Sequence, residues 1–189
     1  MAAPARRMST RAAQAERTRQ QVLETAQRLF AEIGYDATSL QMIADEMGLT
    51  KAAVYYYFPA KSDILAEAMR PGVQRLGVLL DEAAAIRGRR ARTEHLVDGF
   101  ADFLVRNRRA VIASVEPTVS KHAPDSAALE VRDRAMAVMF GDHPAPAERL
   151  AVNVVFLLPK SLPGLVDLTD EELREALKAT MLRILRVSS

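Results

Sequence analysis

The sequence predicts an all-α protein of about nine helices, arranged in two domains. Apolar residues recur at helical spacing through most of the 189 residues, alanine is abundant, and only 8 Gly and 9 Pro interrupt the pattern. No segment shows the alternation of apolar and polar residues that marks a half-buried strand. With 49% apolar and 26% charged residues, the composition is that of a folded domain, which excludes disorder over the whole chain.

Composition and motifs also exclude several classes of function. The chain has no cysteine, which removes disulfides, thiolate metal sites and a thiol nucleophile, and fits a reducing compartment such as the cytoplasm. No window of about 18 uninterrupted apolar residues is present, so no membrane partner is expected. The three histidines lack the spacing of metal ligands. Because the phosphate-binding, serine-hydrolase and zinc-protease motifs are missing, we expect no metal, no cofactor and no catalytic residues, and therefore no enzyme.

Positive charge is concentrated at the N-terminus. The formal net charge is only +2, but residues 1–19 hold five arginines against a single glutamate. Residues 1–15 lack an apolar stripe and are expected to form a mobile basic arm. The basic runs at 87–92 and 106–109 are expected to be solvated surface, the first of them in a loop.

One long helix and two short ones are predicted after this arm. The long helix ends at Gly34, which is expected to be left-handed. Thr38, followed three residues later by Gln41, has the pattern of a capping box and opens the first short helix. Gly48 ends that helix, and Thr50 can cap the second.

The spacing within the two short helices fits a helix-turn-helix. Ala44 falls where the helices touch, Gly48 where the turn needs positive φ, and Val54 where the second helix packs on the first. The capping signals place both helix starts where this spacing requires them. A three-helix domain of the helix-turn-helix type is therefore predicted over residues 16–60.

Residues 61–189 are predicted to form a second, larger helical domain. A long helix begins near Lys61, and Pro71 with Gly72 is expected to interrupt it. Thr169 and Glu172 form a second capping box, which opens the last helix. The other helices are predicted over 94–106, 108–121, with a bend at Pro117, 125–140, 146–158 and 169–186.

The first domain resembles the TetR family of transcriptional regulators. The resemblance is carried by the segments FAEIGYDATS, LQMIADEMGLTKAAVYYYF and PAKSDIL, within about residues 16–70. Ala52 stands where the family frequently has glycine, and Ala60 where a capping Ser or Asp is usual. The resemblance implies a non-enzymatic protein that binds double-stranded DNA and has a C-terminal ligand-binding and dimerisation domain.

The expected DNA contacts combine helix starts, hydroxyl groups and cations. Tyr56 is expected to point outward from the second short helix, whereas Tyr55 and Phe58 are expected to pack inward. The basic arm could follow DNA phosphates, and a solvated tail is an equally open alternative. The predicted DNA-binding set is Arg17, Arg19, Thr38, Ser39, Gln41, Thr50, Lys51, Ala52, Tyr56, Tyr57 and Lys61.

By resemblance, the helices within 94–140 enclose a pocket for an unknown small-molecule effector, apolar or amphipathic in character. Ordinary core packing is the alternative for each residue. Asn153, a polar residue in an apolar helix, could bond either an effector or a partner subunit. The predicted lining is Phe100, Phe103, Leu104, Val115, Met136, Met139, Phe140, Asn153 and Phe156.

A homodimer is expected because one helix-turn-helix covers only one half-site. The segment 146–158 is apolar nearly all round, which calls for burial on two sides. By resemblance, the last two helices of each subunit form a four-helix bundle, and burial within one chain is the alternative. The predicted interface is Leu150, Val154, Leu157, Leu158, Leu173, Leu177, Met181 and Ile184.

The predicted function is that of a ligand-responsive repressor. A homodimer binds a palindromic operator, and the effector releases it through the long helix that starts near Lys61, with Pro71 and Gly72 as hinge. The alternative is an architectural DNA-binding dimer that a protein partner regulates, with no small-molecule effector.

Overall fold

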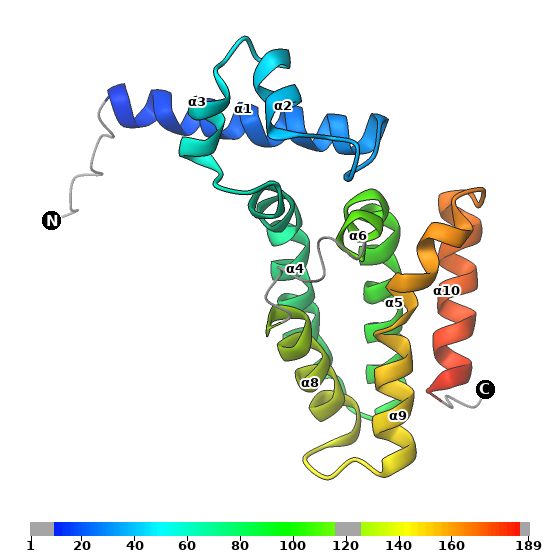
Figure 1. Cartoon of the computed structure of the whole chain (residues 1–189). Helices are drawn as coiled ribbons and strands as arrows, with labels where there is room; N and C mark the ends of the chain where they lie inside the picture. The colour runs from blue at the N-terminus through cyan, green and yellow to red at the C-terminus, as the bar shows by residue number, and fades with distance from the viewer. Residues whose placement is uncertain (1–9, 116–125, 186–189) are drawn as a thin grey trace, which may run out of the picture. The chain divides into compact units, whose positions relative to one another are not determined.

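A computed structural model describes residues 10–115 and 126–185 of the chain, and within them nine α-helices and one 3₁₀ helix form (Figure 1). The all-α prediction is confirmed for this part of the chain. None of its helices is both long and apolar enough to cross a membrane. The chain separates into two compact units, Met1–Ala68 and Met69–Ser189, each of which is described by itself.

The first unit is a small helical domain around one apolar core. Helix α1 packs on both α2 and α3, which also pack on each other. Ile43, Ala44 and Val54 are fully buried between them. The helices are α1 (Thr10–Glu32), α2 (Leu40–Glu46), α3 (Lys51–Tyr57) and the first turns of α4 (Lys61–Ala85).

The start of α1 differs from the prediction. Residues 10–15, assigned to the basic arm, belong to this helix. The segment is rich in alanine, arginine and glutamine, which favour helix even without an apolar stripe of their own. The rest of the predicted arm, residues 1–9, lies outside the described part of the chain.

The turns of the helix-turn-helix form largely as predicted. Gly34 and Gly48 have φ of 93° and 63°, the left-handed conformations expected of them. Thr50 caps α3, because its Oγ1 accepts a hydrogen bond from the N–H of Ala53 at 3.2 Å. The predicted cap of α2 is wrong by one residue: the N-cap is Ser39, not Thr38.

The second unit is arranged around α5. This helix packs against α10, α8 and α6, while α9 bridges α8 and α10 (Figure 1). Leu104, Val152 and Leu173 are fully buried in the shared core. Besides the rest of α4, the elements are α5 (Arg89–Arg106), α6 (Arg108–Ser114), α8 (Ser126–Phe140), α9 (Pro146–Val155), η1 (Leu158–Leu165) and α10 (Asp170–Ile184).

Proline positions explain two differences from the predicted helix limits. Helix α4 continues through Pro71, because the ring is exposed and the following turns of the helix bury Leu76 and Leu80. The segment predicted as one helix over 146–158 ends instead at Val155. The following 3₁₀ helix contains two prolines, which lack the N–H groups that a continuing α-helix needs.

The two basic runs are not simply solvated surface. Arg89 opens α5, pairs with Glu148 at 2.9 Å and stacks 4.4 Å from the ring centroid of Phe140. Arg108 donates hydrogen bonds to the carbonyls of Leu165 and Leu168 and so holds η1 against α6. The Arg108 side chain is only 14% exposed, whereas that of Arg89 stays 53% exposed although it bridges two elements.

The last helix begins as predicted. Thr169 Oγ1 accepts a hydrogen bond from the N–H of Glu172 at 3.3 Å, and the Glu172 carboxylate accepts one from the N–H of Thr169 at 2.9 Å. The Thr169 N–H, together with the Thr169 hydroxyl, which donates to the same carboxylate at 2.8 Å, lowers the pKa of Glu172 below its ordinary value of 4.5. The predicted helix end over 116–121, with the bend at Pro117, lies outside the described residues, as do residues 125 and 186.

Two glycines let α4 and α5 interlock. Gly99 of α5 receives the side chain of Leu79, and a Cβ there would overlap its methyl groups. Gly72 of α4 receives the ring of Phe103, whose Cε2 would lie 2.8 Å from an added Cβ. An added Cβ would lie closer than van der Waals contact allows, so alanine at either position would force the neighbouring side chain to shift.

We expect Gly99→Ala to lower the free energy of unfolding. Overpacking against Leu79 costs roughly 1–3 kcal/mol, which exceeds the gain of up to about 1 kcal/mol in helix propensity. The matched control is Gly77→Ala in α4, where an added Cβ meets nothing within 4 Å. The control is expected to raise stability, and urea denaturation of both variants measures the difference. Equal effects of the two substitutions would contradict the interlocking of α4 and α5.

Candidate DNA-binding surface and effector cavity

Helix α3 presents one polar and aromatic face to solvent. Val54 is fully buried against α2 and Phe58 is 2% exposed, and these two residues set the rotation of the helix. Tyr56 is 81% exposed, as predicted. Tyr55 is 45% exposed, so its predicted inward position is wrong. Its ring lies 5.6 Å from the ammonium group of Lys51, one helical turn earlier.

The remaining predicted residues of α2 and α3 fall into two groups. Ser39, Gln41, Thr50 and Ala52 are exposed. Gln41 Nε2 donates to the Asp45 carboxylate at 2.6 Å, which leaves its amide oxygen as an acceptor. Tyr57 is half-buried: it packs on the core of the first unit and meets Tyr56 edge-on, with ring centroids 5.1 Å apart.

Thr38 is not available to DNA. Its side chain is 2% exposed, and its hydroxyl donates to the carbonyl of Gly34 at 2.7 Å. The hydroxyl therefore closes the turn between α1 and α2, and the exposed Ser39 next to it takes the capping position.

The two predicted arginines of α1 have different surroundings. Arg17 is exposed, in keeping with a phosphate contact. Arg19 is tied inside the first unit: its Nη1 lies 3.2 Å from the Glu67 carboxylate, and its guanidinium stacks 4.8 Å from the ring centroid of Phe58. Arg19 therefore joins α1 to α4, and its role as a phosphate ligand stays a prediction.

The Lys61 side chain also makes its contacts within the first unit. Its ammonium group donates to the carbonyls of Tyr35 at 2.5 Å and Thr38 at 2.8 Å, and lies 3.4 Å from that of Asp36. It stacks 4.1 Å from the ring centroid of Tyr35. Burial lowers the pKa of Lys61, and the nearby charge of Asp36 opposes this shift. With its donors occupied, Lys61 holds the α1–α2 turn against the start of α4 and is not free to bind a phosphate.

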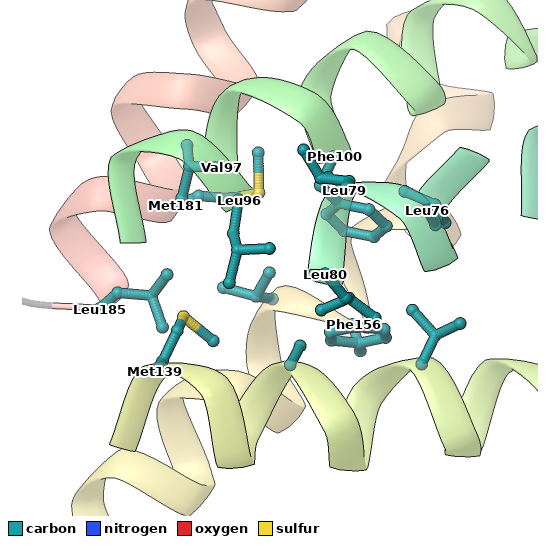
Figure 2. Close-up of a pocket in the computed structure, with 13 residues that line it drawn as sticks. Leu76, Leu79, Leu80, Leu96, Val97, Phe100, Met139, Phe156, Met181 and Leu185 are labelled. Atoms are coloured by element: carbon teal, nitrogen blue, oxygen red, sulfur yellow. The ribbon is translucent and has the colours of Figure 1, made fainter. Parts of the chain in front are cut away.

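The second unit contains an apolar cavity of about 40 Å³. Figure 2 shows Leu76, Leu79 and Leu80 of α4 gathered around it with Phe100 and Phe156. Its lining, drawn from α4, α5, α8, α9 and α10, has almost no polar surface. A volume of this size holds about one or two water molecules, far below the several hundred Å³ of a typical ligand pocket.

The predicted pocket lining is only partly correct. Phe100, Met139 and Phe156 line the cavity. Asn153 does not: it is exposed, its Nδ2 donates to the Arg149 carbonyl at 2.8 Å, and its Oδ1 accepts from Arg132 at 3.3 Å. The other predicted residues are not among the cavity lining, since they pack elsewhere in or around the unit; they are Phe103, Leu104, Val115, Met136 and Phe140.

The predicted dimer residues also separate into two groups. Leu150, Val154 and Leu157 form an exposed stripe at positions i, i+4 and i+7, and Leu150 is 65% exposed. The α10 stripe is instead buried within its own chain, because that helix packs along α5. This corrects the interface prediction for Leu173, Leu177 and Met181; Leu158 and Ile184 are half-buried against the same core.

No group of three His, Asp or Glu side chains that could hold a metal ion occurs among residues 10–115 and 126–185. The candidate site is therefore the exposed face of α3 with its flanking hydroxyls. A short helix that packs on a preceding one and exposes aromatic, amide and cationic groups suits the major groove of DNA.

These features define a helix-turn-helix DNA-binding protein. Residues 22–68 match the family model of bacterial regulatory proteins of the TetR type. Residues 22–68 therefore form a DNA-binding domain of the TetR type.

Curated relatives agree in the same region. The chain is 39% identical over 66 residues to the HTH-type transcriptional regulator AcrR of Shigella flexneri, covering 35% of this chain and 31% of the relative. It is 30% identical over 112 residues to the HTH-type transcriptional repressor KstR2 of Mycobacterium tuberculosis, covering 59% of this chain and 50% of the relative. The matched segments thus span 31% and 50% of the lengths of these two relatives.

Solved structures share the fold over most of the chain. The TetR family regulator PfmR of Thermus thermophilus aligns with a TM-score of 0.65 at 22% identity, covering 87% of this chain and 97% of its own. NalD of Pseudomonas aeruginosa, the secondary repressor of a multidrug efflux pump, aligns with a TM-score of 0.66 at 20% identity, covering 90% and 96%. The helical C-terminal unit is therefore part of a shared architecture.

We expect Lys61→Met and Lys51→Gln to affect DNA binding in different ways. Loss of a phosphate contact reduces the slope of log K against log salt by roughly 0.9, so Lys51→Gln should reduce it and Lys61→Met should not. Lys61→Met should instead lower the free energy of unfolding by about 1–3 kcal/mol, because buried carbonyls lose their donor. Binding to a random-sequence duplex, measured by fluorescence anisotropy at several salt concentrations, tests both. A reduced slope for Lys61→Met would restore it as a phosphate ligand.

Proposed function

We propose that the protein is a transcriptional repressor that binds a palindromic operator as a homodimer and is released by a small apolar or amphipathic effector. The observation that carries the proposal is the outward face of α3, where Tyr56 is almost fully exposed beside Lys51 and Ala52. A large aromatic side chain left mostly exposed to water has an unfavourable solvation free energy, part of which contact with DNA would recover. Such a regulator acts in the cytoplasm, where bacterial DNA lies.

The proposed contacts divide between positioning and base reading. Lys51 and Arg17 supply positive charge for phosphate groups. The hydroxyls of Ser39 and Thr50 accept hydrogen bonds as helix caps, so their hydrogen atoms can still be donated to phosphate oxygens. Tyr56 and Ala52 present apolar surface to thymine methyl groups. Tyr55, missed by the sequence analysis, adds a second exposed aromatic ring on the same helix.

We expect Tyr56→Ala to lower affinity for the selected operator more than affinity for random DNA. One base contact is worth roughly 1–3 kcal/mol, so the ratio of the two affinities should fall about fivefold or more. The operator is first obtained by selecting bound duplexes from a random pool with the full chain. Ile33→Ala is the control, because that residue is also exposed but lies at the end of α1. An unchanged ratio for Tyr56→Ala would remove α3 from base recognition.

The exposed stripe of α9 supports the homodimer. Leu150, Val154 and Leu157 are large apolar residues that the chain itself leaves uncovered. Two copies of this chain would bury the stripe by a two-fold contact and place two α3 helices on successive half-sites.

We expect Leu150→Lys to weaken self-association about tenfold or more, because an interface that buries leucine gains ~1.5–3 kcal/mol from that side chain. The matched control is Leu129→Lys, on α8, where leucine is also exposed but lies outside the stripe. Sedimentation velocity of both variants, together with operator binding, measures the effect. A fully dimeric Leu150→Lys protein would place the interface elsewhere.

The size of the apolar cavity favours the second candidate, an architectural DNA-binding dimer regulated by a protein. At about 40 Å³, the cavity takes an effector only if the surrounding helices move apart. A thermal-shift screen against small molecules separates the candidates, because a bound effector raises the melting temperature and a purely protein-regulated chain shows no such rise.

A further inference from the structure

A second, larger hollow lies on the second unit. It has a volume of about 360 Å³, against about 40 Å³ for the apolar cavity, and residues of α4 and α5 line it. We call it the α4–α5 groove. Its lining is Gly72, Arg75, Leu76, Val78, Leu79, Glu82, Gly99, Asp102, Phe103, Arg106 and Asn107.

The floor of the groove is apolar and fixed in place. Leu79 is held against Gly99 and Phe103 against Gly72, in the interlocking contacts described above. Phe103 also stacks with Phe100, with the ring planes inclined by 7° and the centroids 6.2 Å apart. Because Leu79 and Phe103 are already held by these contacts, they form a preformed surface, which lowers the entropic cost of binding an apolar group.

The polar rim of the groove carries two arginines, Arg75 and Arg106, and two acids, Asp102 and Glu82. Of its two acids, Asp102 pairs with Arg174 of α10, which is not part of the groove, and Glu82 lies 3.3 Å from His95. Among the described residues, Arg75 is exposed and has no ion-pair partner. Arg106 is mostly exposed and reaches Asp102 only at 3.8 Å.

The groove and the apolar cavity share one wall. Leu76 and Leu79 line both, and Figure 2 shows them from the cavity side, beside Phe100. A molecule seated in the groove would therefore press on side chains that also bound the core of the unit. Because packed cores shift between discrete arrangements, this wall provides a physical route from ligand to helix position.

We propose that the α4–α5 groove binds a small amphipathic carboxylic acid. The carboxylate meets the guanidinium groups of Arg75 and Arg106, whose planar donors match its two oxygens. The apolar body lies on Leu76, Leu79 and Phe103. Binding of the acid to the groove does not depend on DNA binding. Only the role of the acid as the effector rests on the proposed repressor function.

Isothermal titration calorimetry of the full chain without DNA tests the proposal with three probes that share one carbon skeleton. 4-Phenylbutyrate is expected to bind, 4-phenylbutan-1-ol to bind at least tenfold more weakly, and 4-phenylbutylammonium not to bind. Arg75→Gln should weaken 4-phenylbutyrate about tenfold. Arg90→Gln is the matched control, since Arg90 is exposed in the first turn of α5 and pairs only with Glu94 among the described residues.

A reporter variant locates the bound probe. The chain contains no tryptophan, and Val78 is an exposed residue of the groove, so Val78→Trp adds a single fluorophore without disturbing the core. Saturating 4-phenylbutyrate should shift its emission. No binding, equal binding of acid and alcohol, equal loss in Arg75→Gln and Arg90→Gln, or an unchanged emission would each overturn the proposal. Selection of an operator by the same preparation shows separately whether the repressor function holds.

Discussion

The contact between α2 and α3 is the constraint on which the DNA-binding surface depends. Ala44 and Val54 are both fully buried, and together they set the rotation of α3 about its own axis. With Val54 and Phe58 turned inward, helical geometry leaves Tyr55 and Tyr56 outside. A residue larger than alanine at position 44 would push α3 away from α2 and change the direction in which Tyr55 and Tyr56 point. The recognition face is thus a consequence of apolar packing beneath it.

Cationic side chains serve the fold more often than their positions in the sequence indicate. Lys61 and Arg19 both fix α4 to the rest of the first unit, one through backbone carbonyls and the other through Glu67. Arg89 and Arg108 bridge elements of the second unit in the same manner. Among the described residues, these four cations are therefore used at least in part within the fold.

The second unit combines a nearly filled core with an open groove. Apolar side chains predicted to surround an effector fill the space themselves, because long side chains from five helices interdigitate there. Phe103, predicted as pocket lining, faces the α4–α5 groove instead. Selecting residues by apolar character identifies the interior of a helical domain, but it does not distinguish a cavity from packed core. Asn153 shows the same limit for polar residues, since its hydrogen-bond partners are Arg132 and the backbone carbonyl of Arg149.

The sequence by itself determined the helix class, the caps at Thr50 and Thr169, the turns at Gly34 and Gly48, and the TetR type of the DNA-binding domain. These are local signals, carried by residues within one or two turns of each other. Only the tertiary structure decided which charges are used internally and which apolar stripes are left uncovered. Lys61 finds its partners 23 and 26 residues earlier in the chain, and α10 buries its stripe on α5. The periodicity of a sequence predicts which residues form the apolar stripe of a helix. It does not predict which element covers that stripe, because this depends on packing between distant segments of the chain.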